Sequence, residues 1–132
     1  MTEPPGDKKQ IGLTPKGAAA MVILMESEQF ATESDAYKVG IAYALALGMS
    51  PADAPEGGYL TKFNAAGGLD SYGDVRDTIT TLLPEASGRP YATAERLAEI
   101  GVTALASQFQ SHVKMPDILK SLTSQDDGMP TP

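Results

Sequence analysis

Residues 31–49, ATESDAYKVGIAYALALGM, decide the fold of this chain. Thr32 followed three residues later by Asp35 is a helix-start signal, and residues 36–49 are apolar except for Lys38. A helix that is apolar on nearly every side has to be covered by other segments or by a second copy of the chain. At about 14 to 16 residues it is too short to cross a bilayer. The stretch therefore predicts a central helix and self-association into a homodimer or higher oligomer.

Residues 8–14, KKQIGLT, precede this helix and alternate between polar and apolar side chains. This period of two is typical of a short, half-buried strand. One face of the predicted strand carries Lys8, Gln10, Gly12 and Thr14, and the other carries Lys9, Ile11 and Leu13. We therefore expect the first of these faces to point outward.

A first helix is predicted directly after this strand, because Thr14 is a suitable cap and Pro15 suits the first helical position. The apolar run Met21–Met25 in its middle would also suit a buried strand, and periodicity alone does not separate the two. The helix formers on either side, Ala18–Ala20 and Glu26–Glu28, favour a helix.

The remainder of the chain predicts a helical extension. The best boundary is Ser50–Gly58, which contains one helical turn and a loop. The segments expected beyond it are a weak strand at Tyr59–Asn64 broken by the glycine-rich Ala65–Asp70, helices at 74–83, 91–112 and 115–122, and a loose tail at 124–132. The predicted fold is thus mainly α, with a short N-terminal strand followed by a helical bundle. Its expected parts are a flexible arm (1–7), an N-terminal unit (8–49), an acidic extension (50–123) and the tail.

Composition limits the classes of function. The 132 residues include ten Lys and Arg against 17 Asp and Glu, a net charge of −7, and no cysteine. Disulfides and thiolate zinc sites are therefore excluded. An acidic chain also lacks the basic footprint that is usual in nucleic-acid binders, although the cluster Lys8, Lys9 and Lys16 is a local basic strip. The N-terminus has no secretory-signal pattern, so a cytoplasmic location is expected.

The order strand, helix, short turn, helix over residues 8–49 resembles the ribbon-helix-helix family of DNA-binding proteins, which includes the Arc- and MetJ-type repressors. The turn at 30–35, FATESD, carries the hydroxyl and the acid of the family pattern but not its glycine. In that family two chains pair their strands into an antiparallel ribbon above interlocked helices, and the ribbon enters the major groove. The resemblance therefore implies a dimeric transcription regulator whose 8–49 unit both dimerises and binds DNA.

The same resemblance implies contacts for particular residues. Lys8, Gln10 and Gly12 would read base edges, with Thr14 at the edge of that face. Thr32 and Ser34 would lie at the start of the second helix, where free N–H groups can bind a phosphate.

A second resemblance involves the end of the central helix and the segment after it. The series ALALGM, Lys62-Phe63-Asn64 and Asp70-x-Tyr72-x-Asp74 is similar to the small E component of bacterial DNA phosphorothioation (Dnd) systems and related phage-defence accessory proteins. That family is helical, self-associates and is implicated in DNA binding. The resemblance therefore implies a DNA-associated accessory factor.

Signals for catalysis, metals and cofactors are weak. Asp70, Asp74 and Asp77 do not match an EF-hand loop, because its third position is Tyr72 and its twelfth is Thr81. Helix capping and solvated charge explain these acids better. The single histidine, His112, lies at a helix end, where interaction with the helix dipole is the usual role. We therefore expect no enzymatic activity, no bound metal and no cofactor.

Two hypotheses for function follow. In the first, the chain is a DNA-binding regulator or accessory factor that acts as a dimer through a β-ribbon. In the second, it is a non-enzymatic adaptor without direct DNA contact, and the acidic face of Tyr91–Leu122 binds a protein partner, such as a basic enzyme of a phage-defence or DNA-modification system. Neither hypothesis involves a membrane.

Overall fold

The structure is a computed structural model that describes residues 6–111. The elements in chain order are strand β1 (Gln10–Leu13), helix α1 (Pro15–Glu26), helix α2 (Glu33–Ala46), the 3-10 turn η1 (Pro51–Asp53), strand β2 (Leu60–Asn64), the π-helical turn η2 (Ala65–Leu69), helix α3 (Asp74–Leu82), the 3-10 turn η3 (Pro84–Ala86) and helix α4 (Pro90–Gln110). The prediction of a mainly α fold with a short strand near the N-terminus is confirmed. The helix predicted at 115–122, the tail, His112 and most of the arm lie outside the described residues.

Local signals explain where α1 and α2 begin. The Thr14 side chain accepts a hydrogen bond from the N–H of Gly17, and Pro15 follows it at the first helical position. Thr32 caps α2 in the same way by accepting from the N–H of Asp35 at 3.1 Å. The apolar run Met21–Met25 lies within α1, so the preference for helix over strand is confirmed.

The two strands form an antiparallel ribbon inside one chain. Gln10 pairs with Asn64 and Leu13 with Leu60, and the register shifts after Ile11, because Lys62 is an extra residue in β2. The backbone of β2 passes so close to Gly12 that a Cβ there would lie 1.7 Å from the carbonyl oxygen of Leu60. The weak strand predicted at Tyr59–Asn64 is thus confirmed, and it is the partner of β1.

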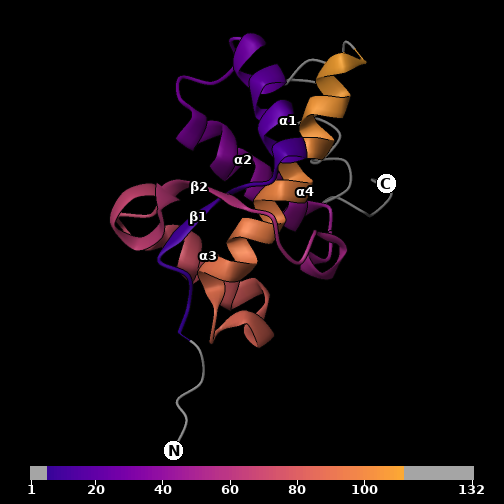
Figure 1. The fold of residues 1–132 in the computed structure, drawn as a ribbon. Coiled ribbons are helices and arrows are strands. Elements are labelled where there is room, and N and C mark those ends of the chain that lie inside the picture. The colour runs from indigo at the N-terminus through magenta and orange to yellow at the C-terminus, as the bar shows by residue number, and fades with distance from the viewer. Residues whose placement is uncertain (1–5, 112–132) are drawn as a thin grey trace, which may run out of the picture.

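The core lies between α1, α2 and α4. Helix α4 runs the length of the molecule, α1 and α2 pack against its upper part, α3 packs against its lower part, and the ribbon crosses in front of it (Figure 1). The side chains of α2 that are buried in this arrangement are Ala36, Tyr37, Ile41, Tyr43 and Ala44. Helix α2 is therefore covered by segments of its own chain, and its burial does not require a second copy.

The order of elements repeats along the chain. Strand β1 is followed by α1 and α2, and strand β2 is followed by η2, α3 and α4. The two strands pair with each other, and the last helices of the two series, α2 and α4, cross at Gly40 and Gly101. A single chain thus contains two successive strand-and-helix units that share one core.

A candidate nucleic-acid interface and the buried carboxylates beside it

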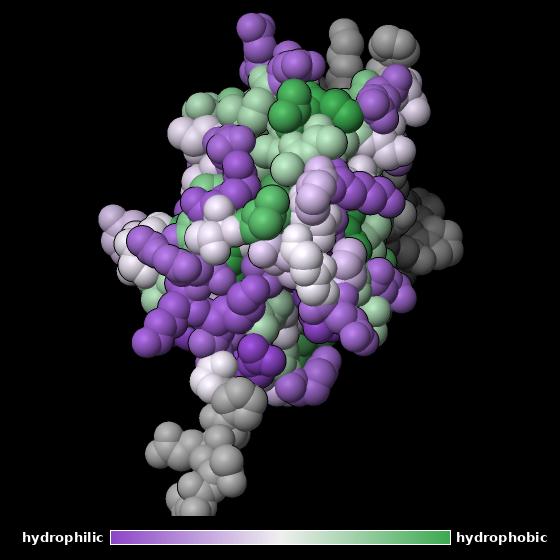
Figure 2. Space-filling view, in the orientation of Figure 1, coloured by the Kyte–Doolittle hydropathy of each residue, from purple (hydrophilic) through white to green (hydrophobic). Residues whose placement is uncertain are grey.

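The ribbon exposes mostly polar side chains. Its exposed residues are Gln10, Leu60, Thr61, Lys62 and Asn64. Figure 2 shows hydrophilic residues over much of the face that carries the ribbon, while hydrophobic residues gather at its upper end, over α1. The ribbon therefore offers amides, a hydroxyl and one ammonium group to solvent.

Only one of the four residues predicted to share the outward face of β1 is exposed there. Gln10 is exposed, whereas Gly12 and Thr14 are buried and the half-buried Lys8 turns toward Glu95 of α4. On the other predicted face, Ile11 and Leu13 are fully buried as expected, whereas Lys9 is exposed. Strand β2 covers Gly12, and Glu99 of α4 covers Thr14. The polar–apolar pattern of the sequence does not predict these tertiary contacts.

The start of α2 lies beside β2. The exposed Thr32 caps the helix and Ser34 is half-buried. The carboxylate of Glu33 forms an ion pair with the Lys62 ammonium at 3.2 Å. Because Lys62 belongs to β2, this ion pair joins the ribbon to the first turn of α2. The structure therefore brings Thr32 and Ser34 close to the ribbon, although the strand next to them is β2 instead of β1.

Two buried carboxylates occupy the edge of β1 that faces away from β2. Glu95 accepts from the N–H of Gly12 at 2.9 Å and from the Lys8 ammonium. Glu99 accepts from the N–H of Thr14 at 3.0 Å and from its hydroxyl at 2.6 Å. The acids are four residues apart and so lie on one face of α4, while alternate N–H groups of a strand point to one edge. These N–H groups of β1 are therefore already bonded and do not form a free edge for a strand of another chain.

The burial of these acids is fully compensated. Glu95 and Glu99 are 3% and 2% exposed, and every buried side-chain nitrogen or oxygen in residues 6–111 has a hydrogen-bond partner. A buried carboxylate without such donors would be strongly unfavourable. In the sequence, the helical spacing of these two acids from Arg89 and Arg96 predicts ion pairs on the helix surface. This prediction is wrong, because both acids are buried and bind β1.

Two tyrosines next to the acids have raised pKa values. Burial raises the pKa of Tyr37 well above its usual range, and the charges of Glu95 and Glu99 add to the effect. Burial and the same carboxylates raise the pKa of Tyr59 to about 12, although Arg96 opposes this. The Tyr37 hydroxyl donates to the carbonyl of Gly12 at 2.9 Å, so both tyrosines serve as neutral phenols around β1.

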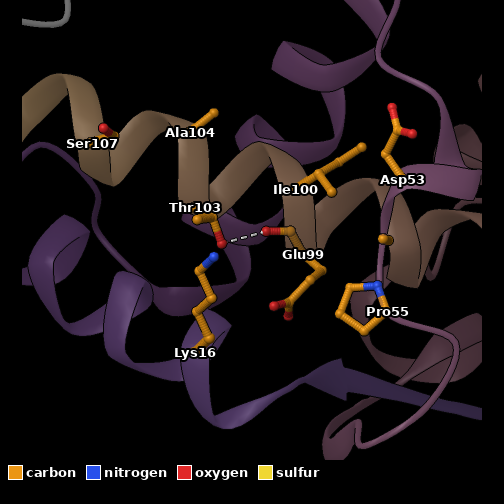
Figure 3. A pocket seen from close by; sticks show the side chains of 9 residues that line it. Lys16, Asp53, Pro55, Glu99, Ile100, Thr103, Ala104 and Ser107 are labelled. Carbon is orange, nitrogen blue, oxygen red and sulfur yellow. Dashed lines mark hydrogen bonds between the residues drawn. The ribbon is translucent and has the colours of Figure 1, made fainter.

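Two pockets flank the acid pair. The larger, about 610 Å³, lies between α1, η1 and α4, where Lys16 and Thr103 point toward one another (Figure 3). The Thr103 hydroxyl donates to the backbone carbonyl of Glu99 at 2.7 Å. The second, about 340 Å³, is lined by Lys8, Glu56, Gly57, Gly58, Tyr59, Arg89, Ala92, Glu95 and Arg96. The first is mainly apolar and the second is mainly polar.

Asp70 has a structural role. It is 4% exposed and accepts from the N–H groups of Val75 and Arg76 at the start of α3 and from the hydroxyl of Tyr91. This agrees with the interpretation of this acid as a helix cap. Within the described part of the chain, no three His, Cys, Asp or Glu side chains gather closely enough to hold a metal ion.

No protein-family model, curated protein or solved structure matches this chain. Between residues 6 and 111, no helix combines the length and the apolarity needed to cross a membrane.

Proposed function

We propose that this protein binds double-stranded DNA through the β1–β2 ribbon of a single chain. The observation that carries the proposal is the antiparallel ribbon itself, which exposes Gln10, Thr61, Lys62 and Asn64 on one molecule. A two-stranded ribbon fits the major groove of B-DNA, and its polar side chains then face base edges. The ribbon-helix-helix resemblance of residues 8–49 supports the same function.

The chemistry of the exposed side chains suits base reading. The amides of Gln10 and Asn64, which are paired across the ribbon, can each donate and accept toward adenine. Lys62 can reach a guanine or a phosphate once it exchanges its partner Glu33. The exposed Lys9, directly before β1, adds a second ammonium group beside the ribbon.

An internal ribbon changes what the DNA site should look like. A dimer of identical strands imposes two-fold symmetry, and its operators are palindromic. Strands β1 and β2 differ in every paired position except Leu13 and Leu60. One chain bound per non-palindromic site is therefore the expected stoichiometry.

The test is selection from a duplex library with randomised central positions, followed by mobility-shift titration at several salt concentrations. We expect one chain per duplex and an affinity that falls steeply with salt. The variant Gln10→Ala/Asn64→Ala should lose roughly tenfold or more in affinity for the selected sequence, since each bidentate base contact contributes about 1–3 kcal/mol. Gln108→Ala, at an exposed position of α4, is the matched control and should bind like the wild type.

Absence of binding at low salt would overturn the proposal, and so would unchanged affinity in the ribbon variant. In that case the adaptor hypothesis, in which a protein partner replaces DNA, becomes the better account.

A further inference from the structure

The smaller pocket borders the ribbon and combines three cations with a glycine loop. Lys8 lies two residues before β1, and Tyr59 directly precedes β2. Arg89 and Arg96 approach from the start of α4, and Gly57 and Gly58 form the loop that closes the pocket. We call this the arginine pocket. Its volume of about 340 Å³ is large enough for a phosphate group together with water.

The cations of the arginine pocket are not equally engaged. The Lys8 ammonium forms an ion pair with the buried Glu95 and lies 5.5 Å from the centre of the Tyr59 ring. Arg89 and Arg96, in contrast, form no ion pair with any residue between 6 and 111. The remaining acid of the pocket is the exposed Glu56. Within residues 6–111, neither guanidinium group is held by an ion pair, so both can contact an external anion there.

The first N–H groups of α4 do not supply this binding. Asp7 accepts from the N–H groups of Tyr91 at 2.6 Å and Ala92 at 2.9 Å, so the start of α4 is already capped. An anion in the arginine pocket would instead be recognised by side chains. A guanidinium group binds two oxygens of a phosphate at once, which favours phosphate over a spherical anion.

We propose that the arginine pocket binds a phosphate group and that, given the DNA-binding function proposed above, this is a backbone phosphate of the duplex held by the ribbon. Arg89 and Arg96 make the contact, and Lys8 holds the edge of β1 next to it. The contact would position the ribbon on the duplex without reading sequence, because phosphate contacts are common to all sequences.

Two measurements test this inference with the full chain. The first compares the salt dependence of DNA binding for wild type, Arg89→Gln/Arg96→Gln and the control Arg76→Gln, whose side chain pairs with Asp77 on α3. We expect the double variant to reduce the slope of log K against log salt by about one unit per arginine and to weaken all sequences equally. The control should keep the wild-type slope.

The second measurement titrates inorganic phosphate and pyrophosphate into the protein and follows the side-chain N–H signals of arginine by NMR. Shifts of Arg89 and Arg96 that vanish in the double variant would show a site for free phosphate, and a slope change without such shifts would identify DNA as the source. DNA binding with an unchanged slope in the double variant, together with no shifts, would overturn the pocket and leave the proposed function intact. Phosphate shifts in a protein that does not bind DNA would support the pocket and overturn the proposed function.

Discussion

Gly101 of α4 lies directly against Gly40 of α2, so that a Cβ on Gly101 would be 1.8 Å from the carbonyl oxygen of Gly40. In the other direction, a Cβ on Gly40 would be 2.6 Å from Cγ2 of Val102. The backbones of the two central helices therefore touch at their crossing, which only glycine permits. This close approach allows α4 to cover the apolar face of α2.

Gly101→Ala should destabilise the protein strongly. The added methyl group meets backbone atoms, which cannot move aside as a flexible side chain can. We expect the free energy of unfolding to fall by about 3 kcal/mol, the upper end of the range for substitutions that overpack a core. The measurement is urea unfolding followed by circular dichroism. Gly67→Ala, where no atom lies within 4 Å of the new Cβ, is the control and should stay within about 1 kcal/mol of wild type. Equal unfolding midpoints for the two variants would contradict the close helix crossing.

Glu95→Gln should also be destabilising, although it changes size very little. Both carboxylate oxygens of Glu95 face donors, the N–H of Gly12 and the Lys8 ammonium, so an amide must turn its NH₂ group toward one of them. We expect a loss of about 2 kcal/mol, as for hydrogen bonds to charged groups. Glu26→Gln at an exposed position of α1 should change stability by less than about 0.5 kcal/mol. If both variants unfold at the same urea concentration, Glu95 does not hold the edge of β1.

Asp7 should matter more than its position near the N-terminus suggests. It caps α4 through two backbone N–H groups, and Asp7→Ala leaves both without this acceptor. The expected loss is about 1–2 kcal/mol, as at other helix caps, while Asp7→Asn should lose less because its amide oxygen still accepts a hydrogen bond. Thermal or urea unfolding of the three proteins gives the order. An alanine variant as stable as wild type would show that the cap does not contribute.

Stability should fall in strongly alkaline solution. Burial and the hydrogen bond to Asp70 raise the pKa of Tyr91 to about 12, and the pKa of Tyr59 is also raised to about 12. Since the pKa of these phenols is higher in the folded than in the unfolded chain, their contribution to stability is complete below pH 10 and is lost between about pH 10 and 12.

This alkaline loss can be measured in two ways. The free energy of unfolding should decrease over that range, and Tyr91→Phe should make the decrease shallower. Phenolate absorbance should show Tyr37, Tyr59 and Tyr91 ionising later in the folded protein than in urea. Ionisation of all tyrosines near their ordinary pKa of about 10 would contradict the burial of these hydroxyls.

Sequence reasoning was most successful where a local rule decides the structure. The caps Thr14 and Thr32 set the starts of α1 and α2 because each acts on the N–H groups of its own first turn. The weak alternation at Tyr59–Asn64 was also sufficient to predict β2. The glycine-rich segment after it was predicted to break the strand, and β2 does end there, where Ala65–Leu69 forms a π-helical turn.

The relationship between the two halves of the chain was harder to see. Phe30, Thr32 and Gly40 are followed 61 positions later by Tyr91, Thr93 and Gly101, a spacing that relates α2 to α4. The signal is faint because most of the residues between these positions differ. It becomes meaningful only once the structure shows that the two glycines meet.

The sequence by itself determined that α2 must be buried, because its apolar side chains cover nearly its whole circumference. Only the tertiary structure decided which segments cover this helix. Periodicity indicates which face of a helix is apolar, but it does not predict which segment packs against that face. The same holds for β1, whose partners β2, Glu95 and Glu99 lie about 50 to 85 residues away along the chain. For this reason residues 31–49 predicted a cover by other segments or by a second copy of the chain, and the fold shows that α1 and α4 cover much of this helix.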